Sequence, residues 1–262
     1  MSLRVVVVHP DLLGTYGDGG NGVVLVQRAR WRGIAAELLE ATSDGPLPVG
    51  DLYCLGGGED AAQAASAERL RADAVLARAV ERGSPVLAVC AGYQILGRTF
   101  PAADGRPLAG VGLLDVSTAK GTGRRAVGEI LAEPLCTDLP VLTGFENHGG
   151  RTTRGPNVDP LARVESGVGN GDGTDGAVSG RVVGTYLHGP VLARNPALAD
   201  LLLSWATGLL LEPLDDGEEA ALRDERIAAV RARHAGRWLS CLGRTARTAR
   251  YVRTARYVRG RS

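Results

Sequence analysis

This chain has little cysteine, few aromatic residues and no long apolar run, and these shortages exclude several classes of protein. Its 262 residues include only four cysteines. They lie far apart and form no Cys-x-x-Cys pair, which disfavours zinc-binding and redox-motif proteins. Scattered cysteines fit a reduced, cytoplasmic setting. No apolar run approaches the roughly 18 residues that a membrane span needs, and the first residues lack the length and cleavage site of a signal peptide.

The charged residues are nearly balanced, with 30 basic and 29 acidic side chains and a formal net charge of +1. A body this close to neutral does not offer the basic surface of a nucleic-acid-binding protein, so we expect no nucleic acid partner. The arginine-rich segment over residues 244–262 keeps that class open as one alternative. A strongly salt-dependent affinity that is lost on deleting this segment would support it.

The N-terminal half alternates short apolar runs with helical segments. Residues 3–8 are dominated by valine, which is typical of a strand buried on both faces of a parallel sheet. Further strands are predicted over residues 51–55 and 85–89, with a helix over residues 61–82 between them. This order predicts an α/β fold with a flavodoxin-like, doubly wound and mostly parallel sheet, which binds ligands at the carboxyl ends of its strands.

The C-terminal half has a different texture. From residue 110 to residue 188 short apolar stretches alternate with many glycines, which predicts an antiparallel strand extension. Helices are predicted over residues 195–211, with Asn195 as the N-cap, and over residues 218–239. We therefore divide the chain into three parts: an α/β domain over 1–211, a helical extension over 212–243 and a disordered arginine-rich tail over 244–262.

Cys90 is the candidate nucleophile. It ends the apolar run over residues 85–89 and is followed by small residues, and then by a helical pattern that begins at Ala91. A sharp strand-to-helix turn of this kind exposes a nucleophile above a sheet, and a helix N-terminus favours the thiolate over the thiol. The alternative is a buried core thiol, which is the commonest fate of an isolated cysteine.

The candidate base is His188, which ends another apolar run far downstream of Cys90. A cysteine and a histidine at two strand ends form a pattern of covalent catalysis. His148 is the rival base. His9 ends a different strand, and His234 lies in a charged helical segment where a surface role is expected.

Glycines and polar loop residues are expected to border the site. The N–H groups of Gly57, Gly58 and Ala91 are candidates for an oxyanion hole, although a tight turn is the alternative for the glycines. No Gly-Lys-Ser/Thr follows, so this glycine run is not a phosphate-binding P-loop. Three polar residues of the first loop either line a pocket or cap the first helix: Tyr16, Asp18 and Asn21.

Three segments occur in the order that one enzyme family shows. They are Cys90-Ala-Gly-Tyr-Gln-Ile-Leu-Gly97, Gly144-Phe-Glu-Asn-His-Gly-Gly-Arg-Thr152 and Gly184-Thr-Tyr-Leu-His-Gly189. Together they resemble the cobyric-acid-synthase-like branch of the class I, triad-type glutamine amidotransferases. More narrowly, the loop over residues 9–21 and the segment over 195–200 look like the glutaminase subunits of lipid II isoglutaminyl synthases. The likeness covers residues 3–210.

This resemblance implies a cytoplasmic, two-protein enzyme of peptidoglycan synthesis. The chain would hydrolyse L-glutamine and supply ammonia to a Mur-ligase-like subunit in a heterodimer. That partner would use ATP and Mg to amidate the D-glutamate α-carboxyl of lipid II, so no cofactor and no metal are expected on this chain. Gln94 would contact the substrate by motif. Arg124 or Arg125 could pair with the glutamine α-carboxylate through two hydrogen bonds, each being otherwise a solvated loop side chain.

Two positions depart from the family pattern. Ala88 stands where the nucleophile turn usually has glycine, which is a small-for-small change. Pro190 stands where many class I enzymes have a glutamate, two residues after the catalytic histidine. The acid that orients His188 is therefore not visible. Either another residue of this chain supplies it or the partner does, and in the second case the isolated chain would be a poor glutaminase.

Two other enzymes remain open. One is the amidotransferase component of cobyrinate or cobyric acid amidation. Cobyric acid synthase would carry an ATP-binding domain ahead of this one, whereas the first predicted strand here begins at Leu3. The other is a stand-alone cysteine hydrolase or peptidase, because fold and nucleophile turn do not fix the substrate. A glutamine-derived thioester on Cys90 would distinguish a glutamine amidotransferase from such a stand-alone hydrolase.

Overall fold

The computed structural model describes residues 2–135 and 138–233. Cys136, Cys241 and His234 lie outside the described residues, as does the tail predicted over 244–262. The expectations for these residues therefore stay predictions.

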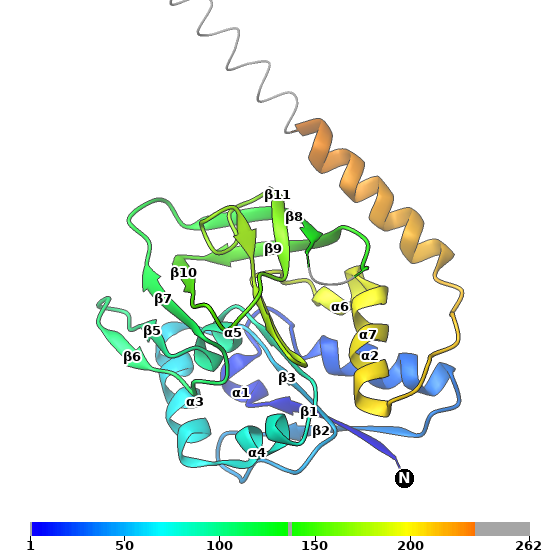
Figure 1. Ribbon diagram of the computed structural model, residues 1–262, viewed down its shortest axis with the longest axis horizontal. Helices are drawn as coiled ribbons and strands as arrows, with labels where there is room; N and C mark the ends of the chain where they lie inside the picture. The colour runs from blue at the N-terminus through cyan, green and yellow to red at the C-terminus, as the bar shows by residue number, and fades with distance from the viewer. Residues whose placement is uncertain (1, 136–137, 234–262) are drawn as a thin grey trace, which may run out of the picture.

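A six-stranded sheet forms the centre of the molecule (Figure 1). Its order is β13-β14-β4-β3-β1-β2, and every neighbouring pair is parallel except β13 with β14. The bounds are β1 (Leu3–Val8), β2 (Ala36–Ala41), β3 (Leu52–Leu55), β4 (Val86–Val89), β13 (Ala177–Ser179) and β14 (Val182–Thr185). The predicted α/β fold with a mostly parallel sheet is confirmed. The apolar runs that predicted it are fully buried, as in β3 and β4.

Two groups of helices pack around this sheet (Figure 1). Helices α1, α3 and α5 contact one another in series, and α2, α6 and α7 form the second group. The bounds of these helices and of α4 are α1 (Pro10–Leu13), α2 (Gly20–Trp31), α3 (Asp60–Ala72), α4 (Val75–Glu81), α5 (Ala91–Leu96), α6 (Val191–Arg194) and α7 (Pro196–Thr207). Asn195 precedes α7 as predicted, but its side chain does not cap the helix. It joins the helix to a strand instead, accepting from the Thr143 N–H (2.9 Å) and donating to the Thr143 carbonyl (2.8 Å).

The region predicted as an antiparallel extension, residues 110–188, supplies most strands of two four-stranded sheets, in the orders β10-β7-β5-β6 and β12-β11-β8-β9. Its last two strands, β13 and β14, belong to the central sheet instead. The bounds are β5 (Thr99–Pro101), β6 (Pro107–Ala109), β7 (Val116–Lys120), β8 (Ala126–Pro134), β9 (Leu142–His148), β10 (Gly150–Arg154), β11 (Ala162–Ser166) and β12 (Thr174–Asp175). All strand pairs in them are antiparallel except β5 with β7. A bridge between Phe145 and His188 joins β9 to the segment that leaves the central sheet.

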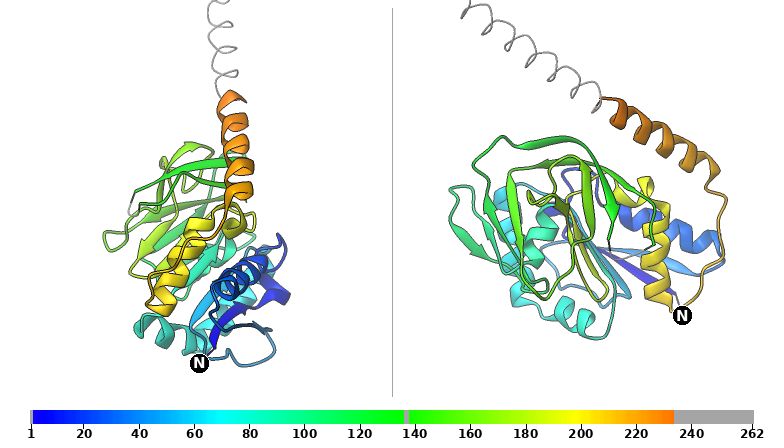
Figure 2. Two further views of the ribbon diagram at one scale, coloured as in Figure 1. Left: turned by 90° about the vertical axis from the view of Figure 1, so that its right-hand side faces the viewer. Right: turned by 45° about the horizontal axis from the view of Figure 1, so that its top comes forward.

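A further helix runs over residues 217–233 and projects along one side of the molecule (Figures 1 and 2). Its Ile227 and Val230 pack on Leu131 of β8, and Arg231 donates two hydrogen bonds of 2.7 Å to Glu165. Among the described residues, no helix combines the length and apolar character needed to cross a membrane.

Candidate active site

The sharp turn predicted at Cys90 is present. Cys90 connects β4 to α5 with φ of 52° and ψ of −104°, a strained conformation that residues other than glycine rarely adopt. The turn depends on Gly92, whose N–H donates to the Gly56 carbonyl (3.0 Å). A Cβ on Gly92 would lie 2.7 Å from the Cβ of Leu55. The close approach of α5 to β3 places the Cys90 side chain at the wall of a pocket.

His188 is held in the interior by an acid from this same chain. Its Nδ1 donates to the Oδ2 of Asp18 at 2.8 Å, and both side chains are almost completely buried. The backbone of His188 is fixed as well, because it exchanges two hydrogen bonds with Phe145 (2.8 and 3.0 Å). Its Nε2 is buried without a hydrogen-bond partner among the described residues. Asp18 thus supplies the orienting acid that the sequence pattern did not reveal.

The electrostatics of His188 favour its protonated form. Burial lowers the pKa of the imidazole, but the hydrogen bond to Asp18 and the interaction with the Cys90 side chain outweigh burial and raise the pKa to about 10. At neutral pH the histidine is therefore an imidazolium facing the cysteine. A proton held this way is available to a leaving group, and the positive charge favours a thiolate as its neighbour.

The glycine-rich segment over residues 14–22 contains all three polar residues that the sequence singled out. Tyr16 lines the pocket, and its ring lies 4.7 Å from the His188 ring, centroid to centroid. Asp18 orients His188. Asn21 accepts a hydrogen bond from the Leu192 N–H (3.0 Å), which ties the first turn of α2 to the α6 segment that follows the histidine.

The three expected oxyanion donors have different surroundings. Gly57 is a correction, because its N–H already donates to the Oδ2 of Asp18 at 2.9 Å and cannot also serve a substrate. It helps to hold the orienting acid instead. Gly58 and Ala91 line the pocket together with Cys90. Ala91 is the first residue of α5, where helix N–H groups lack partners within the helix.

The pocket beside Cys90 has a volume of about 110 Å³. Gln94 lies in its wall with a fixed amide, which accepts from Gln63 (3.0 Å) and donates to the Tyr186 hydroxyl (3.1 Å). Arg125 lines the same pocket and donates to the Asn147 side chain (2.6 Å). Arg124 is exposed and is not one of the lining residues. Of the two predicted arginines, the structure therefore brings only Arg125 to the site.

The other described histidines have different roles from His188. His148 lines the pocket, but its ring stacks on Tyr186 with centroids 3.7 Å apart, and its Nδ1 lies 3.2 Å from the Gly150 carbonyl. This environment makes it part of the pocket wall. His9 is buried and bonds to the Ser66 hydroxyl (2.9 Å).

Two further features lie outside this site. Cys54 is buried, and burial raises the pKa of its thiol to about 12, so it is an inert core thiol.

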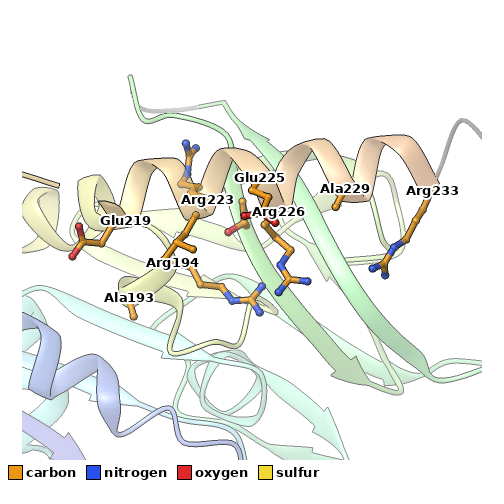
Figure 3. Close-up of a pocket in the computed structure, with 10 residues that line it drawn as sticks. Ala193, Arg194, Glu219, Arg223, Glu225, Arg226, Ala229 and Arg233 are labelled. Atoms are coloured by element: carbon orange, nitrogen blue, oxygen red, sulfur yellow. The ribbon is translucent and has the colours of Figure 1, made fainter. Parts of the chain in front are cut away.

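A larger cleft of about 580 Å³ lies between α6 and the helix over 217–233 (Figure 3). It is lined by several arginines, among them Arg194, Arg223 and Arg226. Neither Cys90 nor His188 lines it.

A cysteine on a strand-to-helix turn, together with a histidine that a buried carboxylate of the same chain holds, is typical of a triad-type cysteine amidohydrolase. Residues 4–196 match the model of the CobB/CobQ-like glutamine amidotransferase domain. The chain belongs to this family, and it is a glutamine amidotransferase. The resemblance inferred from the three sequence motifs is thus confirmed.

Curated relatives narrow the likeness. The chain is 36% identical over 230 residues to a protein of Staphylococcus aureus named lipid II isoglutaminyl synthase (glutamine-hydrolyzing) subunit GatD, covering 85% of this chain and 93% of that protein. The protein of the same name from Streptococcus pneumoniae is 32% identical over 209 residues, or 78% and 80% of the two chains. Cobyric acid synthase of Brucella canis is 41% identical over 124 residues, which are 45% of this chain but only 24% of that protein.

Solved structures agree on the fold. A crystal structure described as a glutamine amidotransferase has a TM-score of 0.55 and 21% sequence identity, covering 78% of this chain and 98% of the other. PurLQS from Thermotoga maritima has a TM-score of 0.50 and 18% identity, with 79% of this chain covered.

Proposed function

We propose that this chain is the glutaminase subunit of a two-protein lipid II isoglutaminyl synthase. In this proposal it hydrolyses L-glutamine through a thioester on Cys90 and supplies ammonia to a Mur-ligase-like subunit. That subunit uses ATP to amidate the D-glutamate α-carboxyl of lipid II. The observation that carries the proposal is the Cys90–His188–Asp18 arrangement in a chain whose likeness to the GatD subunits extends over most of both proteins.

Attack on glutamine begins at Cys90. The thiolate adds to the carbon of the side-chain amide, and the oxygen of the tetrahedral intermediate lies near the N–H groups of Gly58 and Ala91. His188 then donates its Nε2 proton to the departing nitrogen, which leaves as ammonia. Asp18 stabilises the imidazolium before this step and keeps Nδ1 protonated after it.

The second half of the cycle returns the enzyme to its starting state. His188, now neutral, accepts a proton from water, and the resulting hydroxide attacks the thioester carbonyl. Cleavage of the carbon–sulfur bond releases glutamate, and His188 is again an imidazolium beside a thiolate. Arg125 is placed to pair with the substrate α-carboxylate, because it lines the pocket.

The experiment is a reconstitution with lipid II. Ammonia release and lipid II amidation are measured for this chain alone and with the Mur-ligase-like protein of the same host, with glutamine or ammonium chloride as nitrogen source. We expect Cys90→Ser to abolish glutamine-dependent amidation and to preserve amidation from ammonium. Cys54→Ser is the matched control, because this buried thiol is not among the residues that line the pocket, and it should retain both activities.

Other outcomes would overturn parts of the proposal. Amidation of a cobyrinate acceptor in place of lipid II would assign the chain to corrinoid synthesis. High glutaminase activity that is indifferent to the partner would make it an independent hydrolase. Equal activity of Cys90→Ser and the wild type would refute the thioester mechanism.

A further inference from the structure

Asp175 is a fully buried carboxyl group that the mechanism above does not use. It ends β12, has no exposed surface and is not among the residues that line the pocket. Its Oδ2 accepts a hydrogen bond from the Thr185 hydroxyl (2.6 Å), and its Oδ1 accepts one from the Tyr186 N–H (3.2 Å). Both partners belong to the short segment that leads from β14 to His188.

This segment is connected to both Cys90 and His188. The Thr185 hydroxyl also accepts a hydrogen bond from the Leu187 N–H (3.1 Å). The Asp175 carboxylate therefore holds Thr185 and Tyr186 directly, and it holds Leu187 through the Thr185 hydroxyl. The Thr185 carbonyl accepts the N–H of Cys90 (2.9 Å). A shift of Thr185 would therefore move the nucleophile turn and the histidine together.

The surroundings of Asp175 make its charge costly. Burial raises its pKa to about 7; the hydrogen bonds from Thr185 and Tyr186 oppose the shift, and the neighbouring acids Glu146 and Asp172 add to it. Tyr93 of α5 is a further titratable neighbour. Because the folded-state pKa lies above the unfolded value of 3.8, ionisation of Asp175 lowers the free energy of unfolding as pH rises from about 4 to above 7. Above about pH 7, where Asp175 is ionised, we expect a neutral side chain at position 175 to give a protein that is at least as stable.

We propose that Asp175 is a positioning residue whose carboxylate fixes residues 185–187 so that His188 meets Cys90. The inference deepens the proposed function and rests on it. Small displacements of a catalytic group matter, since a misplacement of about 1 Å can reduce a rate about 100-fold. Asp175 acts through the backbone and through Thr185, and it does not contact the substrate pocket.

The test is Asp175→Asn, which keeps the shape of the side chain but replaces one accepting oxygen with a donating NH₂ group. We expect kcat for glutamine hydrolysis to fall about 10- to 100-fold, with KM within about twofold because the residue lies outside the pocket. The Tm at pH 8 should be equal to or above that of the wild type, because a costly buried charge is removed. An Asp175→Asn enzyme with wild-type kcat would overturn the proposal.

A second pair of variants keeps the test decisive if Asp175→Asn does not fold. Thr185→Val removes the hydroxyl that bridges Asp175 and Leu187, and Thr185→Ser keeps it. We expect Thr185→Val to lose kcat and Thr185→Ser to retain at least half of it. Full activity of Thr185→Val would count against the role of this carboxylate.

A third measurement separates failure of this inference from failure of the proposed function. The time course of Cys90 alkylation by iodoacetamide at pH 7, followed by mass spectrometry of the Cys90 peptide, needs no glutamine. We expect alkylation to be slower in Asp175→Asn than in the wild type, because a displaced His188 no longer activates the sulfur. Should the wild type release no ammonia from glutamine, the proposed function fails. Identical alkylation profiles of the two proteins would refute the positioning role.

Discussion

The carboxylate of Asp18 lies 2.8 Å from Nδ1 of His188, a residue 170 positions further along the chain. The same oxygen of Asp18 accepts the Gly57 N–H, so the acid is fixed by backbone from the neighbouring strand end. Three segments that follow β1, β3 and β14 meet at this carboxylate. The candidate site therefore brings a cysteine, a histidine and a carboxylate of one chain together.

This arrangement predicts that Asp18→Asn lowers kcat about 10²- to 10⁴-fold with little change in KM, because the imidazolium loses its counter-charge and its fixed orientation. The measurement is steady-state glutaminase kinetics of the chain with its partner. Asp11→Asn is the control, since Asp11 lies in α1, between β1 and the same loop, but bonds to Ser43. Unchanged kcat in Asp18→Asn would mean that an acid from the partner orients His188.

Much of the candidate site could be predicted from the sequence because its geometry depends on local patterns. A few consecutive residues are enough to predict a nucleophile turn. The end of an apolar run predicts the end of a strand, as at Cys90 and His188. The parallel sheet follows from the same runs. These features need no knowledge of which distant segments meet.

The role of Asp18 could not be derived in that way. It stands in a loop of glycines and polar residues without periodicity, where capping and pocket lining are equally good interpretations. A signal was present nonetheless: β1 and β3 are neighbours, so the loops after them lie side by side at one sheet edge. The misassigned role of the Gly57 N–H has the same origin, since its partner comes from that other loop. Asp175 shows the same limit, because its partners come from a different sheet.

The pKa of His188 predicts how activity and stability depend on pH. With a folded-state value of about 10, the imidazolium persists through neutral pH, and on the alkaline side kcat should fall as pH approaches 10 and the proton donor is lost. The folded pKa also exceeds the unfolded value of about 6.5. The stabilisation from His188 is therefore fully present below about pH 6.5 and is lost as pH rises through about 10.

The check is denaturant unfolding of the wild type and His188→Gln at pH 6, 8 and 10. We expect the difference in free energy of unfolding between the two proteins to shrink steadily across this series. A difference that grows with pH would show that the histidine is neutral in the folded protein.

Arg125 is predicted to bind the α-carboxylate of glutamine. Replacing it with methionine removes the charge but keeps an extended side chain, and we expect KM to rise about 10- to 100-fold, the usual value of a hydrogen bond to a charged group. Its effect on kcat should be small, because the group lies away from the reacting atoms. Arg124→Met is the matched control, being an adjacent arginine that does not line the pocket. A larger effect at Arg124 than at Arg125 would reverse the assignment.

The two small residues around Cys90 predict opposite responses to a change of one methyl group. In Gly92→Ala the new Cβ would lie 2.7 Å from the Leu55 Cβ and 3.0 Å from its backbone, and backbone cannot move aside as a flexible side chain does. We expect a loss of about 1–3 kcal/mol in the free energy of unfolding, together with lower kcat because the turn at Cys90 shifts.

Ala88→Gly restores the glycine usual in this family at a position inside β4, where no strain requires it. It should cost only about 0.5–1 kcal/mol through backbone entropy and leave kcat near that of the wild type. Thermal unfolding and glutaminase kinetics of both variants test the pair. A Gly92→Ala variant as stable and active as the wild type would show that the close packing of α5 on β3 does not hold Cys90 in its strained conformation. The hydrogen bond from the Cys90 N–H to the Thr185 carbonyl would then be the contact that holds it.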